Sequence, residues 1–156
     1  QIRTQVEQAT DIAPDFVVFD GGTNDAQSIF RDRAYTFGAY TEELEKTLHV
    51  MERKWPTARI VYVAAHKLGS RDWDTQVALR EATLEACRKR DVAVADVFGE
   101  TTFDTRDDMQ RAKYTFDDLV NGFPGTEGSG THPNDAGIIT FYVPVLRATL
   151  QQIASR

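Results

Sequence analysis

Residues 14–25 of this chain, Pro-Asp-Phe-Val-Val-Phe-Asp-Gly-Gly-Thr-Asn-Asp, are the stretch that decides its fold. Four apolar residues, Phe16 to Phe19, follow this proline closely and precede two glycines, a pattern typical of a short buried strand. The glycines predict a sharp turn that leaves room for a ligand against the backbone. Asn24 and Asp25 end this turn. We therefore predict a β-strand that leads into a polar loop.

A second polar run, Gly-Thr-His-Pro-Asn-Asp-Ala-Gly, occupies residues 130–137. Pro133 restricts the backbone of His132 to extended geometry, and Asn134 is a good N-cap for a helix that follows. A histidine held at a helix entrance can serve as a general base, and an asparagine amide in a turn can donate to a developing oxyanion. Acyl transfer requires both groups. We therefore expect Asn24 and His132 to face one shared cavity.

Apolar, β-rich segments alternate with segments of helical periodicity along the chain. This alternation favours an α/β fold in which helices cover both faces of a parallel sheet. The last helix should begin at Asn134 and be kinked or split by Pro144. No linker or repeat marks a boundary, so residues 1–156 are predicted to form a single domain. The predicted strands span residues 16–19, 59–65 and 92–96.

Two segments, residues 20–40 and 100–130, do not follow this alternation of strands and helices. Residues 20–40 are rich in Asp, Gly and aromatic residues, and we predict that they are irregular. Thr41 and the two glutamates after it resemble a helix N-cap followed by acidic residues in the first turn, so a helix is expected to begin there. Residues 100–130 interrupt the alternation again. We expect short helices at residues 105–113 and 116–120, followed by a glycine-rich loop.

The composition argues against several classes of protein. The net charge is −6 and no Lys/Arg cluster offers a surface for a phosphate backbone, so we expect no nucleic-acid partner. The apolar runs are much shorter than the roughly 20 residues of a membrane-spanning helix, so we predict a soluble protein without a membrane span and leave its compartment open. The single cysteine, Cys87, excludes an intrachain disulfide and a thiolate zinc cluster. We predict no metal and no cofactor.

Together the two polar runs resemble the third and fifth sequence blocks of the SGNH (GDSL-like) hydrolase family. The third block reads Gly-x-Asn-Asp and is matched by residues 22–25 directly after an apolar strand. The fifth block reads Asp-x-x-His-Pro and is matched by residues 129–133, except that Ser129 replaces the aspartate. The resemblance extends from about Pro14 to the end of the chain. It implies the three-layer, flavodoxin-like fold of that family.

The resemblance also implies roles for the two motifs. Asn24 would help to form the oxyanion hole and His132 would be the catalytic base. Gly22 would shape the oxyanion loop, which we expect Asp25 to anchor by accepting backbone hydrogen bonds. The family's orienting acid holds the imidazole tautomer, and Glu127 is the nearest candidate to replace it at Ser129. Asp117, Asp118 or a backbone carbonyl are the alternatives to Glu127 as the group that orients the His132 ring.

Further side chains are predicted to line the substrate pocket. His66 and Asp96 end the second and third predicted strands, and ligands bind beyond the carboxyl ends of parallel strands. Phe123 lies in the long loop before the histidine motif, where an acyl group or a sugar can pack on an aromatic ring. Each of them has a structural alternative: His66 as a buried histidine of the core, Asp96 as a loop cap, and Phe123 as an aromatic residue that closes the loop onto the core.

The family's first block, Gly-Asp-Ser, supplies the nucleophile from the opening strand. Residues 1–20 do not match it and contain no serine. We therefore expect the first strand or strands, with the nucleophile, to be missing from this chain. Ser28, Ser70 and Ser129 lack the strand-to-turn context that exposes an activated hydroxyl, so we do not expect any of them to act as the nucleophile.

The resemblance implies a serine esterase that acts on carboxylic esters, either small acyl esters or O-acetyl groups on a carbohydrate. The alternative is that the same fold serves as a non-catalytic binding or assembly module, which the unmatched serine block and Ser129 favour. A third interpretation takes residues 20–25 as a nucleotide-binding loop, but the lysine and glycine spacing of a phosphate-binding loop are not found there. The sequence leaves the oligomeric state open.

Overall fold

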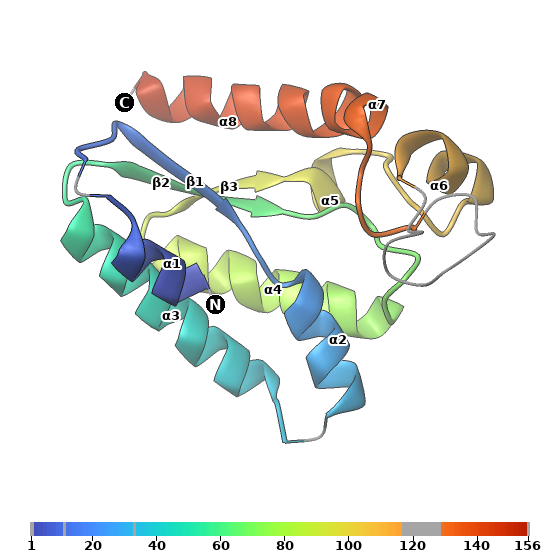
Figure 1. The fold of residues 1–156 in the computed structure, drawn as a ribbon, viewed down its shortest axis with the longest axis horizontal. Helices are drawn as coiled ribbons and strands as arrows, with labels where there is room; N and C mark the ends of the chain where they lie inside the picture. Colours follow the sequence, from blue (N-terminus) through green and yellow to red (C-terminus); the bar gives the residue numbers. More distant parts are fainter. Residues whose placement is uncertain (1, 11, 33, 117–128, 156) are drawn as a thin grey trace.

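A parallel sheet forms the centre of the molecule (Figure 1). The structure is a computed structural model and describes residues 2–10, 12–32, 34–116 and 129–155. Within these residues the strands β1 (Phe16–Asp20), β2 (Arg59–Ala64) and β3 (Ala93–Asp96) lie side by side in that order. All pairs are parallel, and Phe16 is in register with Arg59. The three predicted strands are confirmed to within one residue at each end.

Three helices cover one face of the sheet: α1 (Ile2–Gln8), α3 (Phe37–Lys54) and α4 (Trp73–Lys89) (Figure 1). Their apolar stripes bury Leu48, Met51 and Cys87 against Tyr62 of β2. Complete burial of a side chain such as Leu48 stabilises the fold by about 1.5–3 kcal/mol before the loss of entropy is counted. The helical periodicity of these segments is therefore a sound guide to the core.

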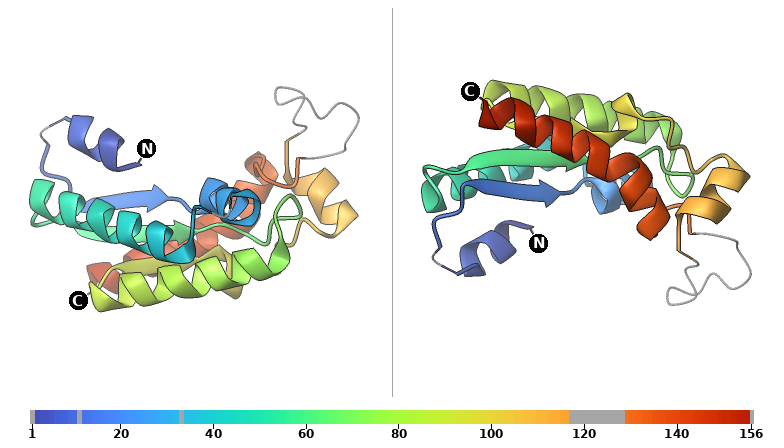
Figure 2. Two further views of the ribbon diagram at one scale, coloured as in Figure 1. Left: turned by 90° about the horizontal axis from the view of Figure 1, so that it is seen from below. Right: turned by 90° about the horizontal axis from the view of Figure 1, so that it is seen from above.

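The helix α8 (Val143–Ala154) covers the opposite face, on the other side of the sheet from α1 (Figure 2). Its Val145 and Ile153 pack against Val61 and Val63 of β2. The predicted architecture, with helices on both faces of a parallel sheet, is thus confirmed. β1 is less well covered, because Val18 is 43% exposed. Among the described residues β1 pairs with β2 alone, so its other edge is open.

The prediction of an irregular segment at residues 20–40 is wrong. Residues Thr23–Arg31 form the helix α2. Its N-cap is Gly22, which has φ 87° and supplies no side-chain hydrogen bond, so the usual capping signal is lacking. The next helix, α3, begins at Phe37, and Thr36 caps it by accepting from the Ala39 amide at 3.2 Å. Thr41 is therefore not the cap, and its hydroxyl instead donates to the Phe37 carbonyl.

The start of the last helical segment is as predicted. The Asn134 side chain caps α7 (Asp135–Gly137) by accepting from the Gly137 amide at 3.0 Å. A π-helical turn, η2 (Ile138–Tyr142), follows, and α8 begins after it with Pro144 in its first turn. A split near Pro144 is not seen, because the backbone stays right-handed helical from α7 through η2 into α8. A proline lacks the N–H that an interior helical residue donates, and the change from π-helical to α-helical geometry falls directly before Pro144.

Two short helices follow β3. α5 (Val97–Glu100) directly continues the strand, and α6 (Asp108–Tyr114) corresponds to the helix predicted at residues 105–113. The second predicted helix, at residues 116–120, lies almost entirely outside the described residues. None of the helices within the described ranges has the length and apolar character needed to cross a membrane.

Candidate functional site

The loops that carry both motifs gather at the carboxyl end of the sheet. The turn after β1, the loop after β2 and the segment before α7 all lie toward the end of the molecule to which the strands point (Figure 1). Ligand sites of open α/β sheets lie at this end, because loops from several strands meet there. The topology thus brings the two predicted motifs to the same end of the fold.

The first motif is a glycine turn that opens directly into α2. Gly22 adopts the left-handed conformation, and a Cβ atom at this position would lie 2.8 Å from Leu79 Cδ2. Glycine is therefore required both for the backbone angle and for the close packing. Because Gly22 is the N-cap, Asn24 lies in the first turn of α2, and Asn24 is exposed to solvent there. Its side-chain amide is thus accessible to a ligand.

Asp25 anchors this turn in a way that the sequence does not reveal. Its carboxylate accepts a 2.6 Å hydrogen bond from the Tyr35 hydroxyl, which lies just before α3. Burial and this hydrogen bond raise the pKa of Tyr35 well above its usual value, so the phenol stays protonated. The expected backbone partners are replaced by a tyrosine, and the contact ties the start of α2 to the segment before α3.

A hollow of about 530 Å³ lies beside this turn. The three oxyanion-loop residues predicted from the sequence line it together, namely Gly22, Asn24 and Asp25. Polar side chains from the end of β1 and from α3 complete the wall, including Asp20 and Glu43. The hollow is large enough for a small-molecule ligand.

His132 lies in a loop that backbone hydrogen bonds hold against the end of α6. Its carbonyl accepts from the Phe116 amide at 3.0 Å, and the neighbouring Thr115 and Pro133 form an isolated bridge. Gly130 turns the loop with φ 69°. His132 is exposed and lines neither the hollow beside Asn24 nor the smaller cavity described below. The loop geometry is therefore well fixed, whereas the ring lies outside both cavities.

Ser129 stands where the resembling family has its acid. Its hydroxyl accepts from the amides of Thr131, at 3.2 Å, and of His132, at 3.0 Å. This side chain therefore fixes the backbone of the loop. The other candidates for the orienting role, Glu127 with Asp117 and Asp118, lie outside the described residues, as does the predicted pocket residue Phe123.

His66 is buried at the end of β2, with 1% of its surface exposed. The Tyr142 hydroxyl lies 2.7 Å from Nδ1 and also accepts from the His66 backbone amide at 3.2 Å. The ring stacks on Phe103 at 4.1 Å. Burial lowers the pKa of His66 to about 4, so the imidazole is neutral near pH 7. His66 and Gly22 both line a cavity of about 40 Å³.

Asp96, the other pocket residue predicted at a strand end, has a structural partner. Its carboxylate forms an ion pair with Arg80 of α4 and caps α5 by accepting from the Gly99 amide at 3.0 Å. The hydrogen bond to Asp96 raises the pKa of Arg80, so the guanidinium stays charged. In the part of the chain that the structure describes, no group of three or more potential ligands comes together as a metal site.

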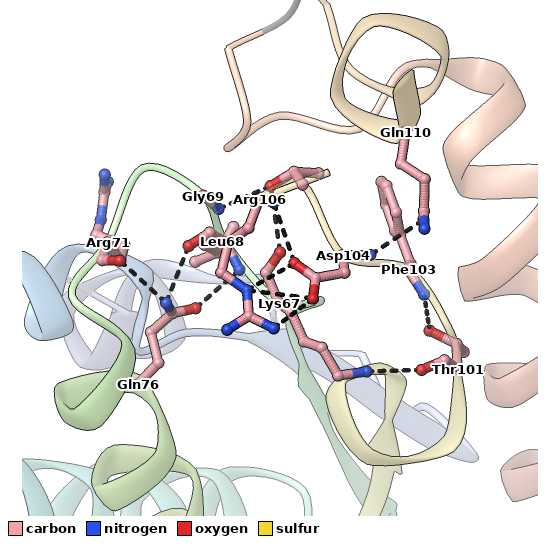
Figure 3. Close-up of polar contacts among 11 residues, drawn as sticks. Lys67, Leu68, Gly69, Arg71, Gln76, Thr101, Phe103, Asp104, Arg106 and Gln110 are labelled. Carbon is pink, nitrogen blue, oxygen red and sulfur yellow. Dashed lines mark hydrogen bonds and ion pairs between the residues drawn. The ribbon is translucent and has the colours of Figure 1, made fainter. Parts of the chain in front are cut away.

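The loop after β2, residues 65–72, is fixed by side chains from distant segments, contacts that the sequence does not reveal (Figure 3). The Gln76 side chain of α4 bonds to the amide and carbonyl of Leu68, at 2.8 and 2.9 Å, and to the Arg71 carbonyl. On the other side, the Gly69 amide donates to Thr105 Oγ1 at 2.8 Å. A buried glutamine thus satisfies the backbone groups of a loop on which both motifs depend.

The parallel sheet with helices on both faces, and the two motif loops at its carboxyl end, define an α/β domain of SGNH-hydrolase type. The profile of the GDSL-like lipase/acylhydrolase family matches residues 1–138, and the chain belongs to this family. The resemblance seen in the motifs is therefore confirmed over most of the chain. No curated protein sequence matches the chain.

Solved structures with the same fold include several esterases. A carbohydrate esterase family 3 protein from Talaromyces cellulolyticus superposes with TM-score 0.63 at 22% identity, over 97% of this chain and 63% of that one. A phospholipase A1 from Streptomyces albidoflavus gives 0.61 at 15%, over 96% and 76%. An acetyl-xylooligosaccharide esterase from Geobacillus, as its W190I mutant, gives 0.59 at 12%, over 94% and 60%. This chain thus spans less than two thirds of the length of the first of them.

Proposed function

We propose that the full protein is a serine esterase in which Asn24 stabilises the oxyanion and His132 moves the proton. The observation that carries this proposal is the meeting of the two motif loops at the carboxyl end of the sheet, where the loop after β2 contacts both. Membership of the acylhydrolase family supports the same chemistry. The site residues follow from the motif match and remain the part to be tested.

The nucleophile in this proposal is a serine of the full protein that does not belong to the 156 residues. The open edge of β1 supports this assignment, because a parallel strand added there would end beside the glycine turn. A serine at the end of such a strand would lie near the hollow that Asn24 lines. The length of the carbohydrate esterase, of which this chain covers 63%, leaves room for such a strand.

The proposed reaction proceeds in two acyl-transfer steps. The serine oxygen attacks the ester carbonyl while His132 accepts its proton, and the Asn24 amide donates to the oxyanion. Collapse of the intermediate expels the alcohol, which takes the proton from His132. Water then hydrolyses the acyl-serine by the same route and releases the carboxylic acid. Glu127 is proposed to orient the His132 ring, with a backbone carbonyl as the alternative.

We further propose that the substrate is an O-acetylated carbohydrate. The support is the fold similarity to an acetyl-xylooligosaccharide esterase and to a carbohydrate esterase family 3 protein. His66, Asp96 and Phe123 are proposed to border the substrate pocket. In this assignment His66 borders the pocket through the small cavity that it lines together with Gly22.

The test uses the full-length protein encoded with this chain. Hydrolysis of p-nitrophenyl acetate, release of acetate from acetylated xylo-oligosaccharides and labelling by a fluorophosphonate probe are expected. His132→Ala should abolish labelling, and Asn24→Ala should lower kcat by about 10²–10³-fold. Ser155→Ala, at an exposed serine just after α8, serves as the control and should retain full activity. A full-length protein that binds acetylated sugar but shows neither labelling nor turnover would instead favour the non-catalytic module.

A further inference from the structure

The Arg71 side chain links the two motif loops, with Ser70 as the intermediate on the His132 side. The Arg71 guanidinium donates from Nε to the Thr23 carbonyl at 2.9 Å, and from Nη1 to the Ser70 carbonyl at 3.0 Å and to Ser70 Oγ at 3.2 Å. Ser70 Oγ in turn is hydrogen-bonded to the Thr131 hydroxyl. Thr23 and Thr131 immediately precede the two predicted functional residues. The chain of contacts therefore runs from one motif to the other through Arg71.

From these contacts we propose that Arg71 is a positioning residue that fixes the Asn24 turn relative to the His132 loop. The inference rests on the proposed function, which gives both loops a catalytic task. The Thr23 carbonyl belongs to the peptide unit whose amide is that of Asn24, so this hydrogen bond holds the residue at its own backbone. On the other side, Ser70 passes the constraint to the residue next to His132.

In the described part of the chain, the positive charge of Arg71 is not neutralised by an ion pair. No carboxylate pairs with it there, and its hydrogen bonds all go to carbonyl and hydroxyl oxygens. Hydrogen bonds from a charged donor are stronger than neutral ones, which suits a group that holds two loops in place. Partial burial lowers the pKa of Arg71, but the guanidinium remains protonated at neutral pH.

The shape of the arginine side chain matters for this role. A planar guanidinium presents several donors in a fixed fork, so one group reaches both Thr23 and Ser70. A lysine carries a single ammonium and cannot reproduce this geometry. The backbone of Arg71 is itself held in place, because the Gln76 side chain donates to the Arg71 carbonyl at 3.2 Å (Figure 3). Two residues earlier, the Gly69 amide donates to Thr105 Oγ1.

A second contact strengthens the same link. Thr105 is completely buried, and its hydroxyl donates to the Gly130 carbonyl at 2.8 Å while it accepts from the Gly69 amide. The loop after β2 is therefore joined to the His132 loop at two positions, Ser70 and Gly69. In the described part of the chain, the hydrogen bond that joins this loop to the Asn24 turn comes from Arg71, which makes Arg71 the side chain to test.

The experiment compares Arg71→Met with Arg71→Lys in the full-length protein on p-nitrophenyl acetate. Displacement of a catalytic group by about 1 Å can cost up to about 10²-fold in rate, so Arg71→Met should lower kcat by about 10–100-fold with little change in KM. Arg71→Lys should recover only a small part of this loss. The control is Arg88→Met, which removes an exposed arginine paired with Glu85 on α4 and should leave kcat unchanged.

Two further readouts separate positioning from a general effect on folding. Guanidinium ion added to Arg71→Ala should restore part of kcat, which a purely structural defect would not allow. Ser70→Ala and Thr131→Val should each lower kcat, and combining either with Arg71→Met should add little, because all three act through one link. Thermal denaturation of each variant confirms that it is folded before its rate is compared.

A measurement without catalysis keeps the inference distinct from the proposed function. If the full-length wild type hydrolyses no ester, the proposed function fails. Amide hydrogen exchange then decides the inference at Ala26, whose amide donates to the Gly22 carbonyl of the Asn24 turn, and at His132, whose amide donates to Ser129 Oγ. Arg71→Met should speed exchange at both positions, whereas Arg88→Met should not. Wild-type kcat in Arg71→Met, or unchanged exchange at both motifs, would overturn the positioning role.

Discussion

The Tyr142 hydroxyl lies 2.7 Å from His66 Nδ1 and joins the end of β2 to the π-helical turn behind the His132 loop. The same hydroxyl accepts from the His66 backbone amide, so one oxygen holds both the ring and the backbone of His66. π-helical turns occur often at functional sites, and this one brings Tyr142 to the residue that follows the strand.

Loss of the Tyr142 hydroxyl should destabilise the fold. Tyr142→Phe leaves both the His66 amide and Nδ1 without their partner, and each buried polar group left unpaired costs about 1–3 kcal/mol. Urea denaturation monitored by tryptophan fluorescence measures the change. The matched control is Tyr114→Phe, since in the described residues the Tyr114 ring makes aromatic contacts and no hydroxyl hydrogen bond. Equal stability of the two variants would contradict the assigned hydrogen bond.

The buried His66 predicts a pH dependence of stability. Burial lowers its pKa from 6.5 to about 4, so between these values the unfolded chain binds a proton that the folded protein does not. The stabilisation is therefore complete above about pH 6.5 and is lost as the pH falls toward 4. The difference amounts to about 3 kcal/mol at most. Urea titrations at pH 7, 5 and 4 check it, and His66→Phe should flatten this part of the profile.

Gly22 should tolerate no side chain. Gly22→Ala places a Cβ atom 2.8 Å from Leu79 Cδ2 on a backbone with φ 87°, which should cost about 1–3 kcal/mol. Gly38 offers a contrast, because a Cβ atom there meets only Thr36 Oγ1 at 3.7 Å. Gly38→Ala lies within α3 and should be neutral or stabilising by up to about 1 kcal/mol. The midpoint of thermal unfolding should fall for Gly22→Ala and should stay equal or rise for Gly38→Ala. Equal midpoints for the two variants would contradict the prediction.

Ser129 should matter for the loop rather than for the imidazole. Ser129→Ala removes the acceptor of the Thr131 and His132 amides, and we expect lower kcat in the full-length protein. Ser129→Asp supplies an acceptor at the same place and should retain most of the activity. Steady-state kinetics on p-nitrophenyl acetate measures both. Wild-type kcat in Ser129→Ala would show that the loop does not depend on this hydroxyl.

The sequence was a reliable guide where local pattern and burial agree. The run Arg59–Ala64 is almost wholly apolar because it is buried on both faces, and its position is confirmed to one residue. α2 escaped prediction because its N-cap is a glycine in the left-handed conformation, so no side chain signals the start of the helix. Thr41 was predicted as the N-cap because acidic residues follow it, but α3 begins four residues earlier, at Phe37.

The candidate site also contains residues that the sequence indicates and contacts that it does not. Asn24 and His132 were found from short motifs, since their chemistry is tied to neighbouring residues. The groups that connect the motifs depend on contacts between distant segments: Ser70 meets Thr131 across 61 residues, and His66 meets Tyr142 across 76. No local pattern carries such information. The predicted roles of Asn24, His132 and Glu127 stay predictions until activity is measured.

The central claim is that Asn24 and His132 serve one reaction centre. The most direct measurement is a crystal structure of the full-length protein after reaction with a phosphonate ester. We expect a phosphonylated serine near the open edge of β1, with its phosphoryl oxygen about 3 Å from the Asn24 amide and its serine oxygen within hydrogen-bonding reach of the His132 ring. A phosphonate attached elsewhere, with these two side chains on separate surfaces, would contradict it.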